Sequence, residues 1–362
     1  MGVAAYMALS GIPSAHPDLK ITAAPAPDYE SLFRKENGWI GADGDYSVLL
    51  DKGRLLWLFS DTFVGRVEGS RRVECTMINN SIAIQPIGKP GAVEFIYHKA
   101  GDGKPASFII PDDGRGYFWL FAGVHTKAGL YLFLKQIENT NAKTGFAFRG
   151  IGESIGHISN PADHPNKWKI TQRKLPFCRY EEKGSLTFGS AVLNAGSYVY
   201  IYGLDSLRSA KSSNAMVLAR APADRFGEFE SWRFYSGGKW TQDHLACDAL
   251  CTDMASEFSV SYLPALKSYV AVYTQGGIFG KIMMRTSPKP EGPWGKPITL
   301  YDCPDKDWHE KTFSYAAKAH PDLAKAPNEL IITYATNSFA FSDLMEDARL
   351  YWPRFVRVTV SQ

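Results

Sequence analysis

Short apolar runs separated by turn-forming residues follow one another along the whole chain, and the pattern is clearest in residues 41–62. An apolar run at 46–50 leads into the turn Asp51-Lys52-Gly53, and a second apolar run follows at 55–59. Two runs of this length around a tight turn predict a β-hairpin.

The hairpin determines where three carboxylates lie. Because a hairpin brings its open ends together, Asp43 and Asp45 before the first strand are expected close to Asp61 after the second. Acids gathered at one end of an apolar hairpin are costly to place without a use. The alternative is structural: Asp43-Gly44 forms a turn and Asp61 ends a loop.

The second strand of this hairpin, LLWLFSD, has four relatives further along the chain, at 117–123, 198–205, 269–276 and 329–337. Each follows a shorter apolar run that begins near a serine; the five serines are Ser47, Ser107, Ser190, Ser259 and Ser314. Repeated units of this kind are typical of radially repeated folds.

Further strand candidates follow each hairpin, which gives four strands per unit in five units. We therefore predict an all-β fold, a five-bladed β-propeller of four-stranded antiparallel blades. The last unit supplies three strands and ends with 355–360, so we expect the segment 19–22 to add the fourth and close the ring. Residues 1–18 are then an N-terminal tail, and 19–362 form a single domain.

The composition fits a folded, β-rich protein. The 362 residues are 13% aromatic and 21% charged, and the net charge of +3 is too small to indicate binding to nucleic acid or to an anionic membrane. No apolar stretch reaches the 18 residues of a membrane-spanning helix. We predict a monomeric protein whose partner is a carbohydrate.

The cysteines and histidines show no zinc-binding spacing, so no metal ligands are predicted. Cys247 and Cys251 could form a local disulfide in an oxidising compartment, although five cysteines leave at least one free. The first fifteen residues resemble the second half of a signal peptide without its positively charged start. We expect a secreted or periplasmic location.

In a propeller, the starts of the inner strands and the ends of their hairpin partners meet on one face. Polar residues that the chain places there are candidates for a binding site: Asp43, Asp45, Asp61, His125, Asp205, Glu257, Gln275 and Asn337. Carboxylates around a polar funnel suit glycoside hydrolysis, in which one acid protonates the leaving oxygen and another activates water or attacks the sugar.

Aromatic residues near the same face could stack on sugar rings, Trp352 among them, although packing within the blades is their commoner use. Asn80 and Ser81 are expected to hydrogen-bond between blades. Arg72 could hold a substrate carboxylate, but an internal pairing is favoured.

Several segments carry a resemblance to a known family, notably GADGDYS, LWLFSDTFVG, SEFSVSYLP and MRTSPKPEGPW. They resemble a family of secreted bacterial five-bladed propellers long labelled domain of unknown function 4185, whose members are known as endo-acting D-arabinanases. Its architecture is similar to that of the arabinanase and β-xylosidase propellers. The resemblance spans Trp39 to Val358 and implies a glycosidase that needs no cofactor.

The resemblance also implies roles for three acids. Asp43 corresponds to a general base or nucleophile, Glu257 to the acid, and Asp61 to a residue that adjusts a pKa or anchors a sugar hydroxyl. These roles can be exchanged, and Glu257 could instead pair with an arginine such as Arg285. By analogy with related propellers, a structural calcium ion could occupy the axial channel, although no residue specifies it.

We predict a glycoside hydrolase that acts on a polysaccharide or oligosaccharide, with furanosyl, arabinan-type substrates as one candidate class. Two other functions remain open. A polysaccharide lyase would use His125 or a tyrosine as base together with an arginine, and its products would absorb in the ultraviolet. A non-catalytic propeller would bind carbohydrate without turnover.

Overall fold

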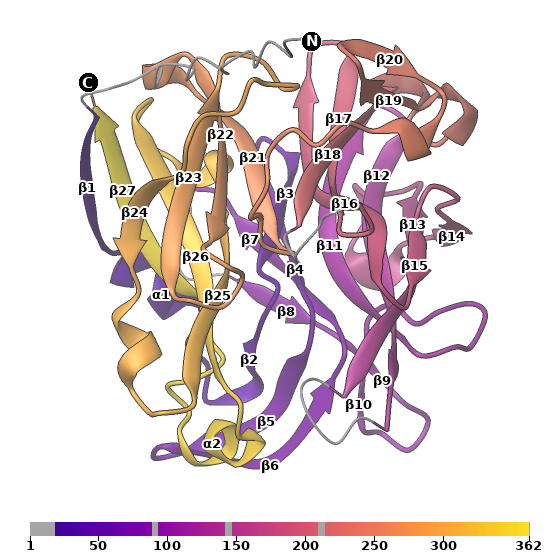
Figure 1. The fold of residues 1–362 in the computed structure, drawn as a ribbon. Helices are drawn as coiled ribbons and strands as arrows, with labels where there is room; N and C mark the ends of the chain where they lie inside the picture. Colours follow the sequence, from indigo (N-terminus) through magenta and orange to yellow (C-terminus); the bar gives the residue numbers. More distant parts are fainter. Residues whose placement is uncertain (1–18, 89–92, 142–146, 209–213, 362) are drawn as a thin grey trace, which may run out of the picture.

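The computed structural model describes residues 19–361, except 89–92, 142–146 and 209–213, and this part of the chain is folded mainly into antiparallel β-sheets (Figure 1). The prediction of an all-β fold is confirmed. Two α-helices occur in the described residues, α1 (Pro27–Phe33) and α2 (Phe341–Glu346). None of the described helices is long and apolar enough to cross a membrane.

Five of the described sheets contain four or more strands. The first is β3 (Tyr46–Asp51), β4 (Arg54–Phe59), β7 (Ser81–Pro86) and β8 (Glu94–Ile96). The second is β11 (Tyr117–Thr126), β12 (Gly129–Asn139), β13 (Phe148–Ile158) and β14 (Ile170–Lys174). The third has six strands: β15 (Arg179–Glu181), β16 (Gly184–Ala195), β17 (Tyr198–Asp205), β18 (Ala215–Pro222), β19 (Arg233–Ser236) and β20 (Lys239–Thr241).

The fourth sheet is β21 (Phe258–Leu263), β22 (Ser268–Thr274), β23 (Lys281–Ser287) and β24 (Ile298–Asp302). The fifth is β25 (Thr312–Ala319), β26 (Glu329–Ser338), β27 (Arg354–Ser361) and, from the other end of the chain, β1 (Lys20–Pro25). Two smaller sheets complete the fold: β2 (Asn37–Ala42) with β5 (Thr62–Glu68) and β6 (Arg71–Ile78), and β9 (His98–Lys99) with β10 (Pro105–Ala106).

The N-terminal strand pairs where it was expected to. β1 runs antiparallel to β27, from Lys20 opposite Ser361 to Pro25 opposite Val356, and Figure 1 shows the two strands side by side. The strand covers residues 20–25 rather than the predicted 19–22.

The strands β3, β11, β16, β21 and β25 are neighbours in that order. They surround a common cavity, to which all five contribute side chains. A hydrogen bond between Ser47 Oγ on β3 and Nδ1 of His320, which directly follows β25, links the first of these strands to the last (2.7 Å).

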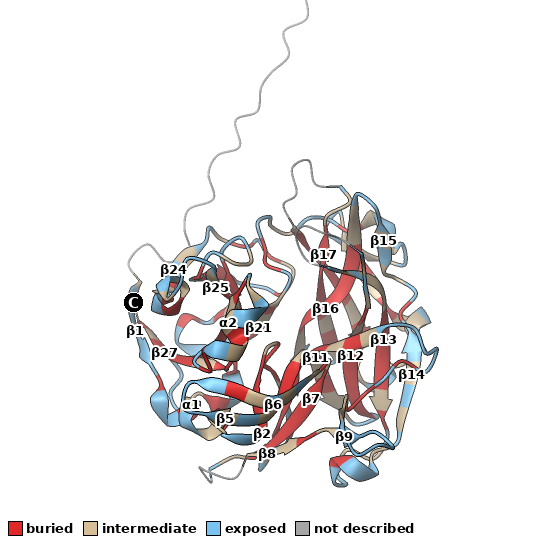
Figure 2. Ribbon diagram, turned by 90° about the horizontal axis from the view of Figure 1, so that it is seen from below, coloured by how far each residue is buried: buried red, intermediate tan, exposed pale blue. Residues whose placement is uncertain are grey.

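The core lies between neighbouring sheets. β4 shows why: five consecutive residues, Leu55 to Phe59, are completely buried, because alternate side chains belong to two different core clusters, one on each face of the strand. Figure 2 shows the same distinction for the whole molecule, with largely buried central strands such as β11, β12 and β16 and exposed residues along β14 and α2. Burial of such runs is the main favourable contribution to folding.

The prediction for the second unit was wrong in one respect. The segment after Ser107 was expected to be the inner strand, but it forms no strand, and β11 takes that place. The side chain of Asn80 explains the difference: its Nδ2 donates to the carbonyls of Ile109 and Phe118, and its Oδ1 accepts from the Ile109 N–H. These bonds satisfy backbone groups that a strand would have paired in a ladder.

Candidate active site

Asp43 and Asp61 lie next to each other, as the hairpin predicted. The Asp43 N–H donates to the Asp61 carbonyl (3.2 Å), and the Ser60 N–H donates to the Asp43 carbonyl (2.9 Å). Gly44 makes this approach possible, since it adopts a φ of +90° and a Cβ there would lie 2.9 Å from the Ser60 nitrogen. The Asp43-Gly44 turn therefore has a structural function that does not exclude a chemical one.

The carboxyl group of Asp43 is held by a tyrosine. The Tyr315 hydroxyl donates to Asp43 Oδ2 (2.6 Å), whereas Oδ1 is buried and has no hydrogen-bond partner among the described residues. Burial, followed by the charges of Asp61 and Glu257, raises the pKa of Asp43 to about 8; the hydroxyl groups of Tyr315 and Tyr351 act in the opposite direction. A neutral carboxyl group costs less to bury without a partner than a charged one.

Asp61 is better supplied with donors. Its Oδ1 accepts from Trp119 Nε1 (3.0 Å) and from Asn79 Nδ2 (3.2 Å). Burial raises the pKa of Asp61 to about 6, while these two donors lower it. Two neighbouring aspartates thus differ in protonation near neutral pH, which is the usual basis of a division of roles between acids.

Glu257 forms an ion pair with Lys318, with 2.7 Å between Oε2 and Nζ. It does not pair with Arg285, which instead donates to Tyr273 and to the carbonyls of Gly295 and Thr252. The charge of Glu257 acts on Asp43, so the two carboxyl groups belong to one electrostatic environment.

Asp45 lies in the same environment but has no exposed surface, and neither of its oxygens has a hydrogen-bond partner in the described part of the chain. Burial raises the pKa of Asp45 well above its usual value; the charge of Lys318 lowers it, and Asp43 and Glu257 raise it. Without exposed surface, Asp45 cannot touch a substrate in this conformation.

Asn337 also belongs to this cluster. Its Nδ2 donates to the Tyr315 hydroxyl (3.3 Å), which in turn donates to Asp43. Tyr351 packs on Phe63 at 5.3 Å between ring centroids, and its hydroxyl group lowers the pKa of Asp43.

Four other predicted site residues have different surroundings. Asp205 is buried and accepts from the backbone of Leu207 and from the Arg208 guanidinium, which explains it as part of a local turn. Gln275 is exposed in the turn after β22. The indole of Trp352 is buried and donates to the Ala348 carbonyl, so this ring packs in the core.

The fourth is His125, which lies in β11 near its end and lines the common cavity together with residues such as Leu49 and Asn194. It was predicted near the acids because β11 was taken for a returning strand. Since β11 is an inner strand, its start, where Trp119 contacts Asp61, faces the acids, and its end points away from them.

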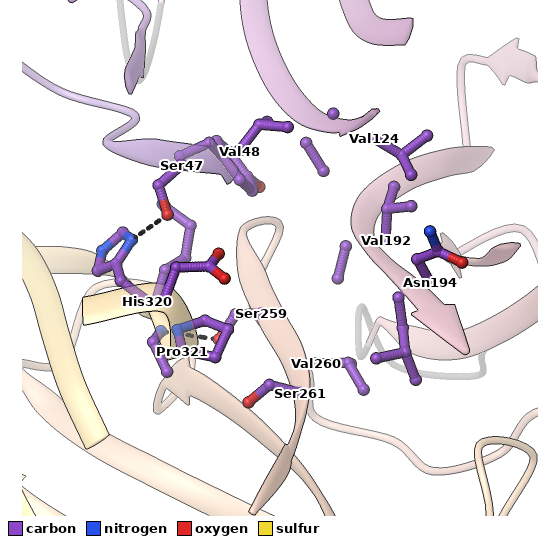
Figure 3. Close-up of a pocket in the computed structure, with 18 of the residues that line it drawn as sticks. Ser47, Val48, Val124, Val192, Asn194, Ser259, Val260, Ser261, His320 and Pro321 are labelled. Carbon is purple, nitrogen blue, oxygen red and sulfur yellow. Dashed lines mark hydrogen bonds between the residues drawn. The ribbon is translucent and has the colours of Figure 1, made fainter. Parts of the chain in front are cut away.

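The common cavity has a volume of about 360 Å³, and its walls include Tyr46, Phe258 and Lys318 but not Asp43, Asp61 or Glu257. Figure 3 shows its lining, with Ser47, Val124, Val192 and Ser259 on strands that surround an open centre. Asp43 precedes β3, Glu257 precedes β21, and Asp61 follows β4. All three acids therefore lie beyond the strand ends that point away from this cavity. Tyr46, Phe258 and Lys318 therefore lie between the cavity and the acid cluster.

His320 in the cavity wall is 1% exposed and bonds to Ser47 Oγ and Thr333 Oγ1. Burial, with a contribution from Lys318, lowers the pKa of His320 to about 3, so the imidazole is neutral at physiological pH. It is tied into the wall on both ring nitrogens and is not a free base.

Among the described residues, no three His, Cys, Asp or Glu side chains are placed to share a metal ion. The Glu257 carboxylate is paired with the ammonium group of Lys318, and the charge of Lys318 also acts on Asp45. Axial calcium stays a prediction by analogy and enters no step below.

The sequence reasoning missed Lys318, Trp119 and Asn79. One signal for Lys318 was available, a lone charge within the apolar run FSYAAKA. Trp119 could not be placed, because its strand was assigned to the wrong position in the sheet. Arg72 was correctly favoured as internal: it is buried and donates to the carbonyls of Ile40, Leu344 and Leu350.

These features describe an all-β protein with a cluster of carboxyl groups beside the ends of strands from several sheets. Residues 26–360 match the family described as "Domain of unknown function (DUF5005)", and the chain belongs to that family. The expected membership of the D-arabinanase family is not confirmed. No curated protein matches the chain.

Solved structures are similar to this chain, and the first of the three below shares its fold. One from Bacteroides ovatus ATCC 8483, provisionally described as a hydrolase, has 19% identity and a TM-score of 0.74 over 93% of this chain and 90% of that one. A GH43 β-xylosidase/α-arabinofuranosidase from a compost metagenome has 14% identity, a TM-score of 0.49, and coverage of 91% and 92%. A levansucrase from Bacillus subtilis has 12% identity, a TM-score of 0.47, and coverage of 88% and 85%.

Proposed function

We propose that the protein is a glycoside hydrolase whose reaction takes place at the cluster of Asp43, Asp61 and Glu257. The observation that carries the proposal is the contrast between two carboxyl groups in one environment. Asp43 retains its proton near neutral pH, and Glu257 is paired with an ammonium group as a carboxylate. Hydrolysis of a glycosidic bond needs one carboxyl group in each state.

In this proposal, Asp43 protonates the oxygen of the leaving sugar, and Glu257 activates water or attacks the anomeric carbon. This exchanges the roles that the family resemblance implied. Asp61, ionised beside Asp43, makes the loss of the Asp43 proton unfavourable in the resting enzyme, because two adjacent charges repel each other. Tyr315 holds the Asp43 carboxyl group in place.

The five large sheets correspond, in our interpretation, to five blades of a propeller that β1 completes. The proposed substrate is a polysaccharide or oligosaccharide, and arabinan-type furanosides are the first class to test. We further propose that the protein is exported and monomeric, as expected for an enzyme that degrades an external polymer.

The surroundings of the acids give less support to a lyase. Burial raises the pKa of both Tyr315 and Tyr351 well above the usual value, which makes them poor bases. Arg72 is occupied by three backbone carbonyls, and His125 lies at the far end of its strand. No arginine in contact with the acid cluster was found among the described side chains to neutralise a uronate.

A screen of plant, algal and mycobacterial polysaccharides for released reducing ends tests the proposal. We expect release by the wild type and a loss of about 10²–10⁴-fold in Asp43→Asn and in Glu257→Gln, the usual contribution of an acid or base catalyst. Asp322→Asn, in the wall of the common cavity and away from the acid cluster, is the matched control and should retain activity.

Near-normal turnover in both variants would remove these acids from the mechanism. Products that absorb in the ultraviolet would indicate a lyase. Binding to the polymers without any turnover would identify a carbohydrate-binding protein.

A further inference from the structure

Lys318 is a lysine with almost no contact with solvent. Its exposed fraction is 1%, although lysine is among the residues least often buried, and burial of its charge is costly unless the charge is paired. It lies in β25, at the boundary between the acid cluster and the common cavity. A charged group in this place requires an explanation in terms of its neighbours.

The ammonium group is held by three surrounding groups. Nζ lies 2.7 Å from Glu257 Oε2 and 2.7 Å from the carbonyl oxygen of Ala316, and it sits 4.4 Å from the centre of the Tyr46 ring. Its charge also acts on Asp45. A carboxylate, a carbonyl oxygen and an aromatic face are each favourable partners for a cation.

The backbone of β25 is built to place this group. Tyr315 pairs with Ala335 and Lys318 with Thr333, so between these pairs two residues on β25 lie opposite one residue on β26. The extra residue is a β-bulge, and Ala316 within it has a φ of +59°. Because Ala335 and Thr333 lie on the same face of β26, the bulge puts Tyr315 and Lys318 on one face, toward Asp43 and Glu257.

We propose that the Lys318 ammonium group is the resident cation of this site and that it positions Glu257 as an ionised carboxylate. The inference rests on the proposed hydrolase function. Lys318 is a positioning residue that acts through Glu257. As a consequence Glu257 serves as the base or nucleophile. Protonation of Glu257 would remove its ion pair with the ammonium group, which lies 2.7 Å away.

Chemical rescue tests the proposal. Lys318→Ala removes three methylene groups and the ammonium, which together have the size and charge of n-propylammonium. We expect kcat to fall by about 10²-fold or more, on the scale of losing a preorganised charge. Added n-propylammonium should restore part of that loss, whereas neutral n-propanol should not. Lys311→Ala, an exposed lysine just before β25, is the matched control and should behave as wild type.

A second variant separates charge from folding. Lys318→Met keeps most of the volume without the charge; we expect a folded protein that has lost kcat and that n-propylammonium cannot rescue, because the space is filled. Restoration of Lys318→Ala by propanol, or by Ca²⁺ in place of propylammonium, would overturn the proposal. So would wild-type kcat in Lys318→Met.

A readout without any substrate keeps this test separate from the hydrolase proposal. Breaking a buried ion pair leaves one charge unpaired, so Lys318→Met and Glu257→Gln should each lower Tm. The double variant should show a smaller fall in Tm than the two single falls added together. Additive effects would mean that the pair is not coupled. Non-additive Tm changes without any polysaccharide hydrolysis would contradict the hydrolase proposal but would still support the ion pair.

Discussion

At the scale of single residues, three aspartates close together in the sequence have three different environments. Asp43 has one hydrogen-bonded and one unpartnered oxygen, Asp61 accepts from an indole and an amide, and Asp45 has no partner among the described residues. Their differences arise from Tyr315 and Trp119, which come from other sheets. Identical side chains therefore acquire different proton affinities only when the sheets assemble.

Tyr315→Phe tests the protonation of Asp43. The tyrosine hydroxyl donates to Oδ2 and favours the charged carboxylate, so its removal should raise the pKa of Asp43 further above about 8. If Asp43 is the proton donor, activity is lost as pH rises through that pKa, and the alkaline limb of kcat/KM should move to higher pH. Tyr262→Phe, an exposed tyrosine in the cavity wall, is the control. A limb that moves to lower pH would contradict the assignment.

The sequence could predict the meeting of Asp43 and Asp61, because both belong to one local hairpin. The burial of Trp352 could not be predicted, since it depends on packing against distant residues such as Trp39. The contact between Asp205 and Arg208 is local, three residues apart, and was missed although both residues belong to one turn. Glu257 was placed with the acids by its position before an inner strand. Its partner Lys318 comes from a different sheet, and a single sequence shows no link between them.

At the scale of elements, the irregular strand matters more than the regular ones. β25 owes the shared direction of Tyr315 and Lys318 to one extra residue, and the alternating pattern of its sequence does not reveal a bulge. The same limitation affected β11. Two apolar runs, at 107–110 and 117–126, fit a strand equally well. In the structure the Asn80 side chain bonds to the backbone of Ile109 in the first run, and the second run forms the strand.

Two changes at Ala316 test the bulge. Ala316→Gly should keep activity and unfold at an equal or higher temperature, because a left-handed conformation costs a residue with a Cβ about 1–2 kcal/mol. Deletion of Ala316 removes the extra residue and turns Tyr315 to the opposite face, so activity should be lost. The measurements are kcat and Tm for both variants. An active deletion variant would show that the bulge does not position the site.

At the scale of the whole molecule, one sheet holds both ends of the described chain. β1 pairs along its full length with β27, and Ile21 and Ala23 pack against the core cluster that contains Val358 and Val360. Propeller architecture was inferred from repeats in the sequence, and the sheet order agrees with four or more strands per repeat. The extra strands β15 and β20 had no counterpart in the repeat and could not be foreseen.

Removal of residues 1–25 tests the contribution of β1. The truncation exposes the edge of β27 and uncovers apolar side chains, so we expect Tm to fall by more than about 5 °C and aggregation to increase. Removal of residues 1–18 alone should leave Tm unchanged, as predicted for a tail outside the domain. Equal Tm values for both truncations, measured by calorimetry, would show that β1 adds little to the fold.

The most direct test of the central claim compares two leaving groups in the two carboxyl variants. The substrates are aryl glycosides of whichever sugar the polysaccharide screen identifies, one with a poor leaving group and one with a dinitrophenyl group that departs without protonation. We expect Asp43→Asn to lose kcat/KM with the first and largely retain it with the second, while Glu257→Gln loses both. The reverse pattern, with Glu257→Gln active on the dinitrophenyl glycoside and Asp43→Asn inactive on both, would contradict the assignment of Asp43 as acid and Glu257 as its ionised partner.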